Sequence, residues 1–232
     1  MNPDNGAALS PRKTVLRALA RPAGIRQRRG TPMRSPFRDL PELRPATAFA
    51  RQAGMYALLF GLIAAAALLL RGALPALHFA PRLADFGLGL AGIVAYTAYN
   101  AAFPALLSAS APGRALLTLL AQRNQTLFGK LPLWTLLPMA VLAGVCEEVL
   151  FRGWLQPLAG LWLASFLFAL VHFPPNRYAW SHPATWAMVA LYFPVGLALG
   201  WLYLWRDNLM APMVAHALSD SLGLFALSRA RR

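Results

Sequence analysis

Long apolar stretches, each close to the length that crosses a lipid bilayer, recur along this 232-residue chain and constrain its fold more than any other feature. An α-helix needs about 20 apolar residues to cross the hydrocarbon layer. Between Thr47 and Trp205 the sequence contains only three acidic residues, which are Asp85, Glu147 and Glu148. Hydrophobic residues make up 58% of the chain and charged residues only 13%, far below the charged share of a soluble domain. We therefore expect an all-α, polytopic transmembrane helical bundle.

The apolar stretches predict about six membrane spans and one less apolar helix. The spans are expected near residues 53–70, 84–107, 132–155, 161–173, 184–205 and 208–227. Residues 112–130 are less apolar and contain three basic side chains, so we expect them to form an amphipathic helix at the membrane surface. Pro157 and Gly160 predict a break between the third and the fourth span.

The first fifty residues differ in composition from the rest of the chain. They contain 10 of the 22 basic residues, interleaved with proline and glycine and without apolar periodicity. Such a composition cannot form a packed core and predicts disorder. We expect residues 1–50 to be a disordered, basic cytoplasmic tail that contacts anionic lipid headgroups, and we expect no nucleic acid as a partner.

The distribution of lysine and arginine predicts the orientation of the spans. With the N-terminus inside, the inner segments contain 18 basic residues and the outer loops contain 3, while Arg152 lies within a span. Cytoplasmic loops of membrane proteins are enriched in lysine and arginine. We therefore expect both termini in the cytoplasm and the protein in the cell (inner) membrane, which is the plasma membrane of a bacterium.

Two adjacent glutamates, Glu147 and Glu148, lie in an otherwise apolar predicted helix. Because an ionised carboxylate is unfavourable in hydrocarbon, an intramembrane acid is a candidate functional residue. Glu148 and Arg152 are four residues apart, so they lie on one helix face and can form an ion pair. We expect this pair to be structural and Glu147 to be free for proton transfer. Alternatively, both glutamates share the arginine, which leaves an unbalanced charge or a bound proton in the membrane.

Two histidines extend this cluster of ionisable residues. His172 ends the next predicted helix, and His216 precedes Asp220 by four residues in the last one. Each of these residues alone could have an ordinary structural role, at a helix end or between helices. Packed in one bundle, however, the helices that carry them can converge on a single buried polar pocket. The single cysteine, Cys146, excludes an intrachain disulfide framework.

These residues form three motifs that resemble those of a known family. In order and interval, the motifs resemble those of the CAAX protease and bacteriocin-processing (CPBP) family of intramembrane proteases, which includes the type II CAAX prenyl endopeptidases. They are Glu147-Glu148-x-x-x-Arg152, Phe168-x-x-x-His172 and His216-x-x-x-Asp220. The resemblance covers about residues 132–227, which we expect to be the protease domain. Residues 51–131 would then supply N-terminal transmembrane helices and the interfacial helix.

The resemblance implies an intramembrane endopeptidase that hydrolyses peptide bonds of membrane-associated peptides or proteins. Glu147 would act as general base on a water molecule, helped by His172. His216 and Asp220 would stabilise the oxyanion or help to place the water. Because the family often has asparagine where this chain has Asp220, and an ionised carboxylate would oppose an oxyanion, we favour a role for Asp220 in orienting His216.

The sequence leaves the cofactor open. The family is commonly described as a metalloprotease family, and Glu147, His172 and His216 could ligate zinc. The same residues could also support a metal-free glutamate mechanism. The chain has no HExxH spacing, so its sequence does not decide between the two.

Two other functions compete with the endopeptidase. One is a catalytically idle membrane scaffold or bacteriocin-immunity protein on the same fold, and the other is a proton-coupled transporter with a relay of buried acids and histidines. We rank the scaffold second because every motif position carries a competent side chain. We rank the transporter last because no internal repeat is visible.

Overall fold

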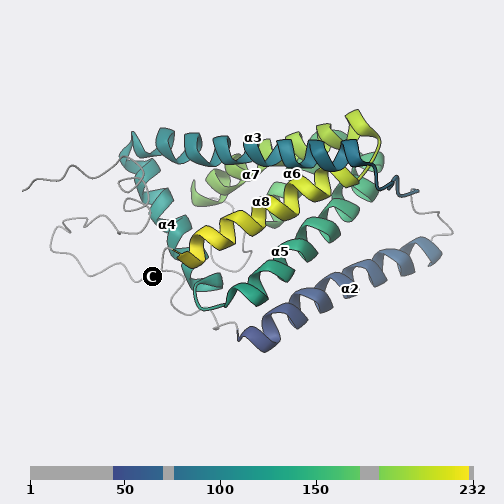
Figure 1. The fold of residues 1–232 in the computed structure, drawn as a ribbon, viewed down its shortest axis with the longest axis horizontal. Coiled ribbons are helices and arrows are strands. Elements are labelled where there is room, and N and C mark those ends of the chain that lie inside the picture. Colours follow the sequence, from purple (N-terminus) through teal and green to yellow (C-terminus); the bar gives the residue numbers. More distant parts are fainter. Residues whose placement is uncertain (1–43, 70–75, 173–182, 230–232) are drawn as a thin grey trace, which may run out of the picture.

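The computed structural model describes residues 44–69, 76–172 and 183–229. Within these ranges the chain is helical with no strand, which confirms the expected all-α class. The elements are α2 (Pro45–Leu69), α3 (Leu83–Ser108), α4 (Ala111–Phe128), α5 (Leu133–Glu148), the π-helix η1 (Val149–Leu155), α6 (Gln156–Val171), α7 (Pro183–Arg206) and α8 (Met210–Arg229). Figure 1 shows them as one elongated bundle. Residues 1–43 of the predicted tail lie outside the described residues, and α2 begins at Pro45.

Five helical stretches in the described part of the chain are long and apolar enough to cross a membrane, in keeping with a multi-pass membrane protein. They are Thr47–Ala67, Leu83–Ser108, Leu133–Val171, Met188–Arg206 and Met210–Arg229. The third stretch has 39 residues and contains two of the six predicted spans. Gly160 interrupts its helical backbone with φ 79° and ψ 166°, a conformation open to glycine because glycine has no Cβ. The predicted break is therefore a bend at Gly160, which joins the two spans.

The shorter helix α4 forms where the less apolar segment was expected. Ser110 caps its N-terminus, because the Ser110 Oγ accepts a hydrogen bond of 3.1 Å from the backbone N–H of Gly113. The helix is not among the five apolar stretches. It connects the end of α3 to the start of α5 at one end of the bundle (Figure 1).

A close approach between α5 and α8 sets the centre of the bundle. A Cβ added at Gly144 of α5 would lie 2.5 Å from the backbone nitrogen of Ala217 and 2.7 Å from the Cβ of Ala217. Only glycine allows the two backbones to come this close. Because Ala217 follows His216, the approach brings the glutamate pair and the last histidine together.

Helix α2 lies along the outer side of α5 (Figure 1). The Gln52 side-chain amide donates a hydrogen bond of 3.1 Å to the carbonyl of Met139 in α5. The ring of Phe60 meets the edge of Trp154 in η1, with ring centroids 5.4 Å apart. These contacts hold α2 against the same helix that carries the two glutamates.

The remaining acid of the apolar region, Asp85, belongs to a structural cluster at the start of α3. Its side chain is fully buried and lies 2.5 Å from both the Arg206 Nε and the Asn208 Nδ2. The Asn208 side chain also exchanges two hydrogen bonds with the backbone of Ala80. Asp85 thus ties the start of α3 to the turn between α7 and α8.

Candidate active site

Glu148 and Arg152 form a buried ion pair that connects three elements. The Arg152 Nη1 lies 3.0 Å from the Glu148 Oε1, and at most 1% of either side chain is exposed. The Arg152 Nη2 donates a hydrogen bond of 2.9 Å to the carbonyl of Gly196 in α7. The guanidinium carbon also lies 4.4 Å from the centre of the Phe168 ring of α6. The arginine therefore joins η1 to both α6 and α7.

The same glutamate also binds His216. The His216 Nδ1 donates a hydrogen bond of 2.8 Å to the Glu148 Oε1, the oxygen that accepts from Arg152. The Asp220 Oδ2 is 3.6 Å from the other ring nitrogen, the His216 Nε2. Glu148 is thus the hydrogen-bond partner of the His216 Nδ1, while Asp220 lies beside the opposite ring nitrogen. The reason is the approach of α5 to α8 at Gly144, which brings Glu148 within reach of the His216 Nδ1.

Glu147 presents its two carboxylate oxygens to different partners. Its Oε1 accepts a hydrogen bond of 2.7 Å from the hydroxyl of Tyr56 in α2. Its Oε2 faces two histidines, with the His172 Nε2 at 3.7 Å and the His216 Nε2 at 4.0 Å. This Oε2 is buried and has no hydrogen bond within the described part of the chain. At these separations one small molecule such as water could bridge the carboxylate and the imidazoles.

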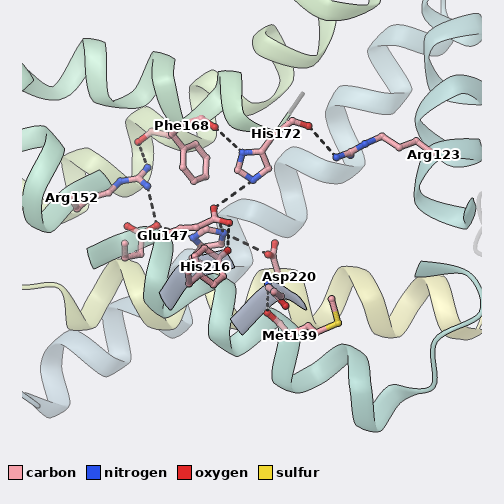
Figure 2. Close-up of polar contacts among 12 residues, drawn as sticks. Arg123, Met139, Glu147, Arg152, Phe168, His172, His216 and Asp220 are labelled. Atoms are coloured by element: carbon pink, nitrogen blue, oxygen red, sulfur yellow. Dashed lines mark hydrogen bonds and ion pairs between the residues drawn. The ribbon is translucent and has the colours of Figure 1, made fainter. Parts of the chain in front are cut away.

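His172 is held on three sides at the end of α6. Its Nδ1 donates a hydrogen bond of 2.7 Å to the carbonyl of Phe168, and its own carbonyl accepts one of 3.0 Å from the Arg123 side chain of α4. Its ring stacks on Tyr192 of α7, with centroids 4.3 Å apart and planes at 21°. Together these contacts direct the Nε2 toward Glu147 (Figure 2).

The structure brings all four predicted catalytic side chains together. Figure 2 shows Glu147 from α5, His172 from the end of α6, and His216 and Asp220 from α8 turned toward one another. The ion pair between Glu148 and Arg152 adjoins this group through His216. The arrangement combines a carboxylate, two imidazoles and a second carboxylate around one position, which suits the activation of a water molecule.

Three further residues of the site escaped the sequence analysis. Tyr56 lies in the first apolar helix, where its only signal is Gln52 one turn earlier, a second polar residue on the same face. Arg123 was assigned to the membrane surface, yet it holds the end of α6. Tyr192 carries no distinguishing pattern in the sequence. None of the three could be connected to the motifs without the packing of the helices.

The donor atoms of the site can be compared with those of a zinc centre. Both histidines have their Nδ1 engaged and their Nε2 directed inward, as histidine ligands of metals commonly do. However, no group of three or more His, Cys, Asp or Glu side chains within residues 44–69, 76–172 and 183–229 has the arrangement of a metal site. In this geometry the residues do not fit a bound zinc ion, so we route no catalytic step through a metal.

Comparison with known proteins finds a family model that matches the segment carrying these motifs. Residues 129–222 match the family model described as "Type II CAAX prenyl endopeptidase Rce1-like", and this segment contains all three motifs. The chain is 35% identical over 99 residues to "Uncharacterized protein YpbD" of Bacillus subtilis (strain 168). The aligned residues make up 43% of this chain and 49% of that protein. The chain thus spans about half the length of this curated relative, and no solved structure matches it. The segment from residue 129 to residue 222, with the whole glutamate and histidine cluster, is therefore similar to the Rce1-like type II CAAX prenyl endopeptidases.

Proposed function

We propose that the protein is an intramembrane endopeptidase that hydrolyses peptide bonds of membrane-associated peptides or proteins, with Glu147 as general base. One observation carries this proposal. The buried Oε2 of Glu147 has no hydrogen bond among the described residues and faces the Nε2 atoms of His172 and His216. A general base must reach the proton that it removes directly or through one water molecule, and this geometry suits such a water.

The charges of the cluster favour a protonated His216. Glu147 and Glu148 together bring two negative charges into an apolar environment, and Arg152 supplies one positive charge. Buried charges are stable only when they are paired. A His216 imidazolium would balance the second negative charge while its Nδ1 donates to Glu148. Its Nε2–H would then point toward the position that Glu147 and Asp220 also face.

The reaction follows from these roles. The Glu147 Oε2 takes a proton from the water as the water oxygen attacks the peptide carbonyl carbon. The carbonyl oxygen becomes an oxyanion, which accepts a hydrogen bond from the His216 Nε2–H. When the carbon–nitrogen bond breaks, the leaving amine takes the proton back from Glu147. His172 accepts a hydrogen bond from the water through its unprotonated Nε2, because its Nδ1 carries the proton that binds the Phe168 carbonyl.

We propose that Asp220 helps to place the attacking water and that Arg152 is structural. The Asp220 Oδ2 lies near the same His216 nitrogen that faces Glu147, so it can accept from a water in the cluster. Arg152 binds Glu148, which is not the proposed base. Glu148 in turn fixes the His216 ring. Loss of the arginine should therefore act through folding and through His216.

We also propose that both termini lie in the cytoplasm and that the site faces the cytoplasmic half of a bacterial inner membrane. The excess of basic residues in the inner segments supports this orientation. His172 lies next to the interfacial helix α4 through Arg123, so the catalytic cluster would lie nearer to that surface. Peptides or proteins of the lipid bilayer would be the substrates.

The proposal can be tested by mapping new protein termini in membranes of cells that express the chain. We expect termini that appear with the wild-type protein and disappear with Glu147→Gln and with His172→Ala. Loss of a general base typically lowers a rate about 10²–10⁴-fold, so the cleaved products should fall below detection. Peptides that span the mapped cleavage points then serve as substrates for the purified enzyme.

The matched control is Asp207→Asn, which also removes one acidic charge. Asp207 is exposed and binds His78 in the turn before α8, away from the catalytic cluster. Its cleavage products should equal those of the wild type. If Glu147→Gln produced the same new termini as the wild type, the mechanism would be wrong. If no variant and no wild-type sample produced any, the scaffold or immunity function would take its place.

A further inference from the structure

Helix α2 lies outside the family segment of residues 129–222 and still contributes a side chain to the catalytic cluster. The Tyr56 hydroxyl donates a hydrogen bond of 2.7 Å to the Glu147 Oε1. Tyr56 is only 5% exposed, so its hydroxyl is shielded from solvent. A hydrogen bond from a buried donor to a carboxylate is among the stronger ones in proteins.

Tyr56 occupies the middle of a contact line between α2 and α5. Gln52, Tyr56 and Phe60 are spaced four residues apart, so they share one face of α2. Gln52 is fixed by the Met139 carbonyl and Phe60 by the Trp154 ring. The tyrosine hydroxyl is therefore held from both sides along the helix, and it is aimed at Glu147.

This hydrogen bond divides the two oxygens of Glu147 between two tasks. The Oε1 is engaged by Tyr56, so the Oε2 is the atom that remains directed toward His172 and His216. The titratable or charged groups that face or neighbour Glu147 are Tyr56 from α2, Cys146 and Glu148 from α5, Arg152 from η1, His172 at the end of α6, Tyr192 from α7, and His216 and Asp220 from α8.

We propose that Tyr56 is a positioning residue for Glu147, supplied by a helix that the family motifs do not include. The proposal rests on the proposed function for its catalytic meaning, because it assumes that Glu147 is the base. Its physical content is narrower: the Tyr56 hydroxyl fixes the orientation of one carboxylate. That content can be measured without a substrate.

The chain contains only three glutamates, Glu42, Glu147 and Glu148, so their carboxyl groups can be observed individually. Protein labelled with carboxyl carbon-13 glutamate, carrying Glu42→Gln and purified in detergent, would show two carboxyl NMR signals. The signal that disappears in Glu147→Gln is that of Glu147. In Tyr56→Phe, this signal should change its chemical shift, because the Glu147 Oε1 loses its hydrogen-bond donor.

Two comparisons separate positioning from general packing. Tyr203 of α7 is also 5% exposed, so Tyr203→Phe removes the hydroxyl of an equally buried tyrosine and should leave the Glu147 chemical shift unchanged. A fluorotyrosine at position 56 is a stronger donor and should move the Glu147 signal in the direction opposite to Tyr56→Phe, which also covers the case in which Tyr56→Phe folds poorly. An unchanged Glu147 chemical shift in both position-56 variants would overturn the proposal.

Catalysis supplies a second readout, which separates failure of this inference from failure of the proposed function. On a peptide from the terminus mapping, Tyr56→Phe should lower kcat about tenfold with little change in KM. If Glu147→Gln is inactive while Tyr56→Phe matches the wild type in kcat and in the Glu147 chemical shift, the role of Tyr56 is refuted and the proposed function stands. If the chemical shift changes as expected while Glu147→Gln still cleaves, the positioning stands and the proposed function fails.

Discussion

The Glu148 Oε1 lies 2.8 Å from the His216 Nδ1 and also accepts the hydrogen bond of Arg152. One carboxylate oxygen thus connects the first motif to the third. The ion pair that looks purely structural in the sequence also determines which nitrogen of His216 points into the site. Substitutions in this pair should therefore affect stability and chemistry in different proportions.

Arg152→Ala should destabilise the protein because it leaves Glu148 buried without its cation. Breaking a buried ion pair costs about 3–5 kcal/mol, which should appear as a lower thermal midpoint in detergent. Adding Glu148→Gln should recover part of that stability, because it removes the unpaired charge. It should not recover activity, because a neutral amide no longer stabilises the His216 imidazolium. An Arg152→Ala protein as stable as the wild type would contradict the ion-pair assignment.

Asp220→Asn should retain most of the activity, whereas Asp220→Ala should lose at least about tenfold, or about 1.4 kcal/mol of transition-state stabilisation. Asparagine keeps the size of the side chain and one acceptor oxygen for a water near the His216 Nε2, and alanine keeps neither. The measurement is kcat/KM of both variants across pH on one mapped peptide. Severe and equal losses would mean that the carboxylate itself is required. Full activity in both would make the third motif structural at this position.

Gly144→Ala should disrupt the approach of α5 to α8. The added Cβ would meet the backbone of Ala217 at 2.5 Å, and overpacking of this kind typically costs about 1–3 kcal/mol. Gly61→Ala in α2 makes the same chemical change at a helical position with no atom within 4 Å, so it is the matched control and should be neutral or slightly stabilising. Thermal midpoints of the two variants would decide. Equal stability would mean that the helices can separate without loss.

Removal of metal ions should leave the activity intact. The donor atoms do not have the arrangement of a metal site within the described residues, and in the proposed mechanism Glu147 activates the water without a metal. Enzyme dialysed against a strong zinc chelator should therefore keep its rate on a mapped peptide. A loss of more than about tenfold that zinc restores would show that His172 and His216 close on a metal in the active enzyme.

The sequence predicted the site residues that stand out because they are ionisable and lie in apolar helices. Ionisable residues are rare in apolar helices, so Glu147, His172 and His216 could be singled out and grouped by their motifs. It could not predict that Glu148 reaches His216. That contact depends on the absence of a Cβ at Gly144, which lies 72 positions before His216 in the chain. The contact between Tyr56 and Glu147 spans 91 positions and leaves no local pattern.

The helices were predicted with similar success. Apolar length located the membrane-spanning helices, and lower apolarity located α4. The separation of the third and fourth spans depended on a single backbone conformation at Gly160. The rule that identified Glu147 applies equally to the buried Asp85. Its two side-chain partners, Arg206 and Asn208, show that an intramembrane acid can also connect helices.

The π-helical segment Val149–Leu155 makes the number of residues in this stretch as important as their identity. A π-helical turn accommodates an extra residue, and such turns often occur at functional sites. Deleting one residue after Arg152, for example Trp154, would keep every motif letter. If the wide turn persisted, everything downstream would turn by about 100°, including the helix that ends at His172. The downstream register would survive only if the segment closed into a regular α-helix. An alignment gap in this stretch would therefore mark a chain that has kept the motifs but has lost either the wide turn or the position of His172.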